Sequence, residues 1–262
     1  MRTGIGGGKR TFVFALLVGA AMIMLPQLAS AVDFVAVVPD GRTVQRNISS
    51  ADRVGFFFSV QAGRSYSVTV VTDDNFTGLT AGFSDSAGGT CDDVDDAFVV
   101  RHETTEPRIA FGAGRGVRAS FIAPATQAFV ACVTSSSAGV NPIFATVSET
   151  TIVNPAWSTF GTFETFYSLA NTTNVPLNAT LKIFNTAGAE VGSFNFNGIP
   201  AGGTLSTNTG ALAVANNLNG SATIVHDGPP GAIICEAAIA DFATAPRVIQ
   251  PVTCTAVREA AH

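Results

Sequence analysis

Short runs of apolar and β-branched residues, separated by turn residues, recur along the whole chain and restrict its fold more than any other feature. In Tyr66–Val70 the apolar side chains alternate with serine and threonine, as in a strand with one buried face. Turn signals such as Pro39-Asp40-Gly41 and Asn197-Gly198 end these runs. Strands this short and evenly spaced predict an all-β chain built as a sandwich.

The expected strands fill both halves of the chain. In the first half they are Thr43–Ile48, Val54–Val60, Tyr66–Thr72, Ala97–Arg101, Arg108–Phe111, Arg118–Ile122, Ala128–Thr134 and Ile143–Ser148. In the second half they are Thr165–Ala170, Ala179–Asn185, Val191–Phe196, Thr204–Thr207, Ser221–His226, Ile233–Ala240 and Val248–Val252. Leu212–Leu218 is expected to form a short helical turn.

Composition agrees with this pattern and excludes several classes of protein. Charged residues make up only 13% of the chain, whereas phenylalanine occurs 20 times, which disfavours helical bundles and coiled coils. The net charge is −5 and no cluster of lysine and arginine follows residue 10. The sequence therefore argues against a nucleic-acid-binding protein.

The first 31 residues have the order of parts of a secretory signal peptide. Three basic residues precede the uncharged run Thr11–Leu25, and Ala29-Ser30-Ala31 provides small residues for cleavage. The run is shorter than the ~20 residues that a spanning helix needs. We expect cleavage before Val32 and export to the periplasm, the cell surface or the medium, with no transmembrane segment in the mature chain.

Removal of this leader makes the protein more acidic. It takes three of the 14 basic residues and none of the 19 acidic ones, which leaves a net charge of −8 and a single lysine, Lys182. Such a chain is not suited to hold anionic membranes or nucleic acid.

The mature chain divides into two halves of different charge. Eight arginines lie between Arg42 and Arg118, but only three basic residues follow residue 150. Asn154-Pro155 interrupts the strand pattern near the change. The prediction is a signal peptide at 1–31, a β-sandwich at 32–150 and a second β-sandwich at 151–262, of jelly-roll or immunoglobulin-like type.

All four cysteines follow the leader, and an exported chain meets an oxidising compartment. An even number of cysteines then indicates disulfides, although four allow three connectivities. The division into halves favours Cys91–Cys132 and Cys235–Cys254. A zinc site is the alternative, but no CxxC pair supports it.

The segment from about 43 to 148 carries a loose series of motifs. These are Val54–Gly63, Tyr66–Val70, Gly82–Gly88, Phe121–Pro124 and Phe129–Val133. In this order they resemble the bacterial pre-peptidase C-terminal domain, a secreted β-sandwich. The resemblance implies a non-catalytic module that accompanies exported proteins. The family usually has a D-x-Y-x-F entry to the first of these strands, whereas in this chain Asp52 lies further back and phenylalanine replaces the tyrosine.

The region from about 157 to 258 looks like an immunoglobulin-like sandwich of bacterial exported proteins. The runs that carry this are Phe166–Thr172, Ala179–Phe184, Glu190–Phe194, Ile199–Thr204 and Gly220–Val225. This second resemblance implies an architecture and no activity.

Cys91–Asp96 places four carboxylates, Asp92, Asp93, Asp95 and Asp96, within five positions. Carboxylate oxygens on a loop are ligands that Ca²⁺ accepts in extracellular proteins. The spacing does not match an EF-hand, and the alternative is a solvated acidic loop. Calcium is the only cofactor that the sequence suggests.

Two further groups invite a functional interpretation. His226-Asp227 resembles part of a catalytic relay, but neighbouring strand residues point to opposite faces, so we expect a strand end and a rigid turn instead. Trp157, Phe160 and Tyr167 are candidates for a ligand-stacking platform; the alternative is a core or inter-domain cluster.

No catalytic signature accompanies these features. The sequence therefore predicts a non-catalytic exported protein, a surface or accessory interaction module with an unknown protein or glycan partner. One alternative is a calcium-stabilised carbohydrate- or adhesin-type binding protein, and another is a hydrolase with an unrecognised site.

Overall fold

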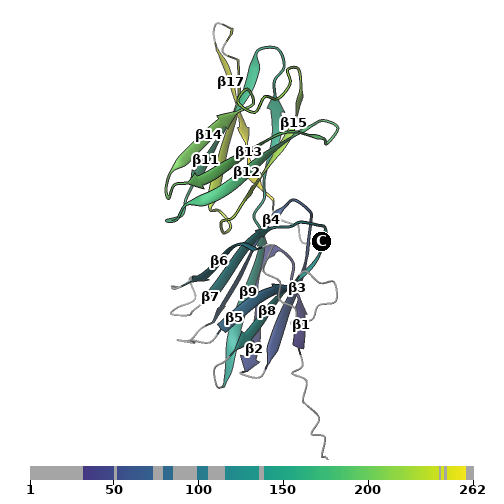
Figure 1. Ribbon diagram of the computed structural model, residues 1–262, viewed down its shortest axis with the longest axis vertical. Helices are drawn as coiled ribbons and strands as arrows, with labels where there is room; N and C mark the ends of the chain where they lie inside the picture. Colours follow the sequence, from purple (N-terminus) through teal and green to yellow (C-terminus); the bar gives the residue numbers. More distant parts are fainter. Residues whose placement is uncertain are drawn as a thin grey trace, which may run out of the picture.

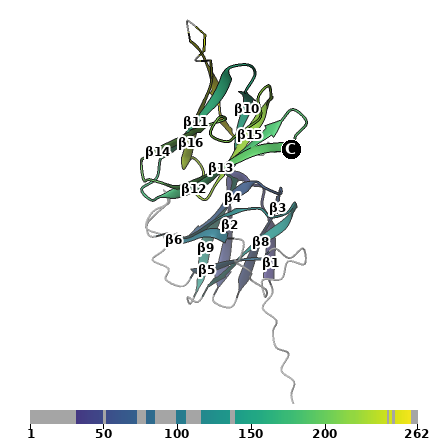
Figure 2. The ribbon, with the colours of Figure 1, turned by 45° about the horizontal axis from the view of Figure 1, so that its top comes forward.

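A computed structural model describes residues 32–49, 52–72, 79–84, 99–105, 116–135, 139–241, 243–244 and 247–257. These residues form strands and connecting turns arranged as two β-sandwiches, one stacked on the other along the long axis of the molecule (Figure 1). Figure 2 shows the same two layers of strands in each sandwich from a second direction. The all-β sandwich class predicted from the alternation is confirmed.

The first sandwich contains strands β1 to β9 in two sheets. Sheet A has the order β1-β3-β8-β5, and sheet B has the order β2-β9-β4-β7-β6. Their bounds are β1 Val32–Ala36, β2 Asp40–Ser49, β3 Arg53–Val60, β4 Ser65–Thr72, β5 Leu79–Ser84, β6 Val99–Thr105, β7 Gly116–Ile122, β8 Gln127–Ser135 and β9 Val140–Glu149.

The second sandwich contains strands β10 to β18, also in two sheets. Sheet C has the order β13-β12-β15-β10-β18, and sheet D has the order β14-β11-β16-β17. Their bounds are β10 Ile152–Ser158, β11 Phe163–Asn171, β12 Leu177–Asn185, β13 Glu190–Ile199, β14 Thr204–Asn208, β15 Asn219–His226, β16 Ile233–Asp241, β17 Val248–Thr253 and β18 Thr255–Ala256.

Each sandwich has its own hydrophobic core. The first core follows the predicted alternation: in β3, Phe56, Phe58 and Val60 are buried, while Phe57 and Ser59 point outward. Phe58 packs near Phe121 and Phe129 of sheets B and A, with ring centroids 6.3 Å away in both cases. Because strands of both sheets contribute these rings, the aromatic cluster holds the two layers together.

Trp157 of β10 is the centre of the second core. Its side chain is 1% exposed, and its indole N–H donates to the carbonyl oxygens of Phe184 (2.8 Å) and Ser221 (3.0 Å). Gly220 lies opposite Trp157 in the β10–β15 pair. A Cβ atom at Gly220 would collide with the carbonyl oxygen of Phe184, so only glycine allows this close approach of strands.

Strand β1 was not expected from the sequence. Val32–Ala36 pairs with β3 in parallel, and the ring of Phe34 covers Gly55, where a Cβ atom would come within 2.6 Å of the ring. The sequence pattern did not predict β1, because the position of this strand depends on the contact of Phe34 with Gly55 of β3. In the described residues, no helix is long and apolar enough to span a membrane.

Two local expectations were wrong. Leu212–Leu218 forms turns instead of a helical segment, with positive φ angles at Ala213 and Asn217 that a helix does not allow. Asn154-Pro155 does not interrupt the strand pattern but lies within β10, where the pairing with β15 shifts register between Asn154 and Trp157. An irregularity of this kind accommodates a proline inside a sheet.

The chain passes from the first sandwich to the second at Thr150 and Thr151, between β9 and β10. Both residues are buried. Thr150 donates a side-chain hydrogen bond to Ser65 (2.9 Å), and the Ser65 N–H donates to the Thr151 hydroxyl (3.0 Å). Two consecutive residues held in this way leave little freedom at the junction.

Candidate functional site

The acidic loop that suggested calcium, Asp92, Asp93, Asp95 and Asp96, lies outside the described residues, as does Cys91. Calcium binding by this loop therefore stays a prediction. Within the part of the chain that the structure describes, no group of three or more histidine, cysteine, aspartate or glutamate side chains could hold a metal ion.

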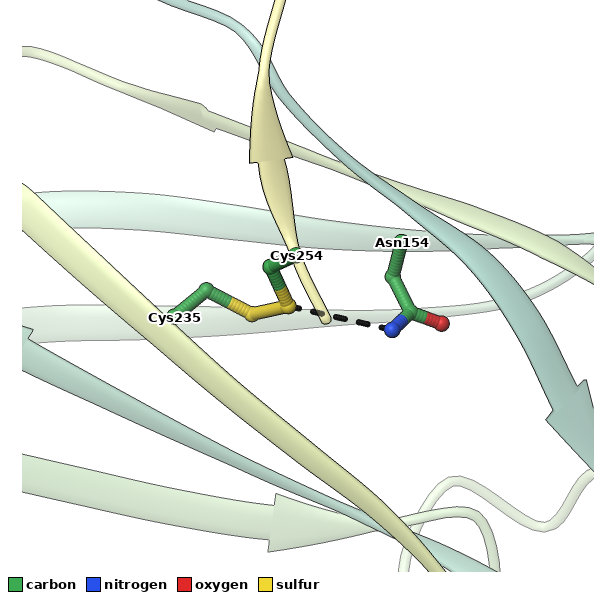
Figure 3. The surroundings of a disulfide bond; sticks show 3 residues. All are labelled: Asn154, Cys235 and Cys254. Atoms are coloured by element: carbon green, nitrogen blue, oxygen red, sulfur yellow. Dashed lines mark hydrogen bonds between the residues drawn. A yellow bond between two sulfur atoms is a disulfide. The ribbon is translucent and has the colours of Figure 1, made fainter. Parts of the chain in front are cut away.

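Cys235 and Cys254 form a disulfide, with Cα atoms 5.7 Å apart (Figure 3). Cys235 belongs to β16 of sheet D, and Cys254 lies where the chain leaves β17 for β18 of sheet C. The amide nitrogen of the buried Asn154 lies 3.7 Å from the Cys254 sulfur (Figure 3). The bond thus fixes the crossing between the two sheets. Cys132 is also disulfide-bonded.

Burial contradicts the proposed stacking platform. Trp157 and Tyr167 are each 1% exposed in the second core, and burial raises the pKa of the Tyr167 hydroxyl. Only Phe160 is open to solvent, at 57% exposure. The alternative, a core cluster, holds for Trp157 and Tyr167, because the strand alternation turns both of them inward.

His226 and Asp227 do not form a catalytic relay. His226 is buried at the end of β15, where its Nδ1 accepts a hydrogen bond from the Gly228 N–H (3.2 Å) and its ring bonds to the backbone of Thr150. Burial lowers the pKa of His226 to about 4, against a smaller opposing effect of Asp227. The imidazole is therefore neutral at ordinary pH and bridges the second sandwich to the junction.

Asp227 serves a different structural purpose. Its two carboxylate oxygens accept hydrogen bonds from the backbone N–H and the side-chain amide of Asn178, each at 2.9 Å. The carboxylate thus ties the end of β15 to β12. The two residues contact different elements, and the strand-end interpretation of His226-Asp227 agrees with this arrangement.

Two clefts at the junction are lined by charged residues whose charges are balanced. One cleft, of 470 Å³, includes Asp40, and the other, of 590 Å³, includes Arg64 and Lys182. Asp40 pairs with Arg42 (3.1 Å), Arg64 with Glu149 (2.9 Å) and Lys182 with Glu190 (3.7 Å). A charge that is already neutralised by a neighbouring side chain contributes little to the binding of a charged ligand.

The outer face of sheet D, unlike the two clefts, carries a charged side chain that pairs with no described residue. The register of β14, β11, β16 and β17 aligns side chains on this face in cross-strand rows. One row is polar: Ser206, Ser168, Glu236 and Thr253. The adjacent row is mostly apolar: Asn208, Phe166, Ala238 and Pro251. A hollow of 580 Å³ is lined by residues of both rows, among them the small side chains of Ser168 and Ala238.

Among the described residues that line this hollow, Glu236 is the only charged one. Among the described residues, its carboxylate has neither a hydrogen bond nor an ion pair. Ile234, 53% exposed, and Ile249, 61% exposed, extend the apolar surface on the same sheet. An open hollow with one unpaired carboxylate between apolar side chains is the candidate site, which we call the sheet D hollow.

Sequence reasoning missed this site. It predicted strands at Ile233–Ala240 and Val248–Val252 but assigned no binding role to their outward residues. The signal was present in Ile234, Glu236 and Ala238, which alternate with Ile233, Cys235 and Ala237. Both faces of this strand are largely apolar, and apolar side chains gathered on an exposed sheet face are a common mark of an interaction surface.

No protein-family model matches the chain, and no curated protein matches it. Among solved structures, the chain is similar to the pre-peptidase C-terminal domain of collagenase from Bacillus anthracis. The TM-score is 0.31 and the identity 9%, over 45% of this chain and 96% of that one. This is the family that the first half resembles in sequence.

Two further structures cover more of the chain. A protein from Eubacterium rectale, named as a candidate secreted protein, has a TM-score of 0.29 and 8% identity over 81% of this chain and 74% of its own. The adhesin domain of Epf from Streptococcus pyogenes has a TM-score of 0.27 and 9% identity over 82% and 76%. At these values the likenesses carry no argument about ligand or activity.

Proposed function

We propose that this protein is an exported, non-catalytic interaction module that acts in the periplasm, at the cell surface or in the medium. The observation that carries the proposal is the use of His226 and Asp227. They are the pair that most suggested catalysis, and the fold uses both to join structural elements. A buried imidazole that is neutral at ordinary pH and already hydrogen-bonded is a poor proton acceptor for a substrate.

Other ionisable side chains support the same conclusion. Glu149 is buried and pairs with Arg64, while Asp241 accepts hydrogen bonds from Thr162 (2.9 Å) and from the Ala243 N–H (2.9 Å). These hydrogen bonds lower the pKa of Asp241, the backbone bond of Ala243 contributing most. Carboxylates engaged in this way stabilise turns and strand ends, and they are not free for acid–base catalysis.

Export is supported by the leader-like first 31 residues and by the disulfide between Cys235 and Cys254, because such bonds persist in oxidising compartments. The extended pair of sandwiches presents large sheet surfaces, and the sheet D hollow is one of them.

The test has two arms on the full exported chain. The first measures hydrolysis of ester, peptide and glycoside substrates between pH 4 and pH 9, with His226→Gln and Asp227→Asn as matched variants. We expect no turnover in any of the three proteins. Turnover by the natural chain that is lost in a variant with unchanged circular dichroism would identify an enzyme.

The second arm asks for a partner in the cell. A photo-crosslinking amino acid is placed at Ile234 in the second sandwich or at Val140, 70% exposed, in the first. We expect a discrete protein adduct from at least one position in the exported fraction. The absence of an adduct from both positions would count against an interaction module.

A further inference from the structure

We infer that the sheet D hollow binds an extended segment of a partner protein through a lysine or arginine side chain flanked by aliphatic residues. The inference rests on the proposed function and specifies its partner chemistry. The volume of the sheet D hollow, 580 Å³, lies within the range of about 300–1,000 Å³ that is typical of ligand sites.

The two rows of the hollow match the two parts of a basic side chain. Long basic side chains carry an apolar stem and a charged end, and they lay the stem on apolar surface. Phe166, Ala238 and Pro251 provide that surface. In the adjacent row, the Glu236 carboxylate and the hydroxyl group of Thr253, which pairs with it across β16 and β17, accept hydrogen bonds.

Charge favours a cationic occupant. Within the described part of the chain, Glu236 has no counter-charge and no basic residue lines the hollow. The chain as a whole carries 19 acidic and 14 basic residues. Its field therefore attracts cations and repels anions. A carboxylate beside apolar surface gains most from a partner that neutralises it while excluding water.

A second copy of this chain is a poor occupant. A two-fold contact centred on the hollow would place the same patch on both sides and bring two Glu236 carboxylates together. Like charges brought together in a water-excluding contact destabilise it. The exposed edge of β17 is also a poor place for strand addition, because Pro251 at its centre has no N–H to donate.

A glycan is disfavoured by the arrangement of aromatic rings. Sugar faces stack on exposed aromatic side chains, but Trp157 and Tyr167 point into the core. Among the described residues, Phe166 is the only aromatic ring on the outer side of the hollow, and it is half-buried. Exposed isoleucines at 234 and 249 instead suit the aliphatic side chains of a peptide on either side of the basic residue.

The experiment selects peptides from a displayed library of random 12-residue sequences on the full exported protein. We expect enriched peptides to contain lysine or arginine next to aliphatic residues. Synthetic copies are then titrated against three proteins. Glu236→Gln should weaken binding about fivefold, as for an exposed ion pair near the upper end of its range. Ala238→Arg, which fills the hollow and supplies its own cation, should abolish binding.

Glu190→Gln is the matched control. Glu190 is a solvent-exposed carboxylate in the same sandwich, but it lies on β13 of sheet C and pairs with Lys182. Its substitution changes the net charge by the same amount and should leave peptide affinity unchanged. Sodium chloride at ~0.5 M should weaken binding to the natural chain more than to Glu236→Gln, because salt screens the ion pair.

Several results would overturn the inference. These are no enriched peptide, enriched peptides without a basic residue, or equal weakening by Glu236→Gln and Glu190→Gln. Glycan-array binding that Ala238→Arg abolishes would assign the hollow to sugars instead. If the hollow fails these tests while crosslinking at Val140 yields an adduct, the interaction module stands and only this site is wrong. Turnover in the hydrolysis assay would refute the proposed function itself.

Discussion

Acidification should destabilise the second sandwich through His226, and His226→Gln should remove this effect. In the folded protein, burial lowers the pKa of His226 to about 4, whereas an unfolded chain has a histidine pKa of about 6.5. Between these values the unfolded chain binds the proton and the folded chain does not. The contribution of the neutral, buried His226 to the unfolding free energy is therefore fully present above pH 6.5, and it is lost as the pH drops toward 4.

The size of the effect follows from the two pKa values. A tenfold change in a proton equilibrium corresponds to about 1.4 kcal/mol, so the interval from about 6.5 to about 4 amounts to roughly 3 kcal/mol of unfolding free energy. His226 is buried beside the backbone of Thr150, so solvent screens its contribution to the unfolding free energy little. Glutamine keeps hydrogen-bonding capacity at this position but does not titrate.

The assay is urea denaturation at pH 7.0, 5.5 and 4.0. Trp157 is the only tryptophan of the chain and lies in the second core, so its fluorescence reports the second sandwich alone. The natural chain should lose roughly 3 kcal/mol more than His226→Gln between pH 7 and pH 4. Carboxylates such as Asp241 titrate alike in both proteins and cancel in the difference. Equal pH dependence in the two proteins would refute the buried, neutral histidine.

Four further predictions address other parts of the molecule. Trp157→Phe should lower the unfolding free energy by about 2 kcal/mol, from lost burial and the lost indole hydrogen bonds; an unchanged urea midpoint by circular dichroism would contradict its central role. Joint replacement of Cys235 and Cys254 by alanine should cost about 3 kcal/mol, since the bond closes a loop of 19 residues; calorimetry measures it, and no shift would count against this bond. N-terminal sequencing of the exported protein should begin near Val32, and an intact Met1 would refute leader cleavage. If Asp92–Asp96 binds calcium with a Kd near 0.5 mM, melting in ~5 mM calcium should exceed melting with chelator by a few degrees, and Asp93→Asn with Asp95→Asn should abolish the gain.

The alternation of apolar and polar residues was sufficient to locate those strands whose inward residues are apolar and whose outward residues are polar. Strands β3, β4, β8 and β12 lie within one or two residues of the ranges expected from the sequence. Strands β1, β10 and β18 could not be found in this way. Their places depend on partners distant in sequence: Phe34 on Gly55, and Ile152 opposite Ala256.

The candidate site was less predictable than the fold, for a physical reason. A hollow on a sheet depends on which short side chains become neighbours across strands, and the register decides this. Ser168 and Glu236 are 68 positions apart in the chain but lie side by side in sheet D. Burial likewise could not be read from residue type, since Trp157 and Phe160 are both aromatic but only Phe160 is exposed.

The second sandwich begins and ends at the same place. Its first strand, β10, pairs with its last, β18, through Ile152 and Ala256, and the Val257 N–H donates to the Thr151 carbonyl at the junction. A unit whose two chain ends are neighbours can be inserted into another protein, or removed from this one, without stretching the host chain. The region from 152 to 257 is thus built as a transplantable unit, and a gene fusion could acquire or lose it in a single step.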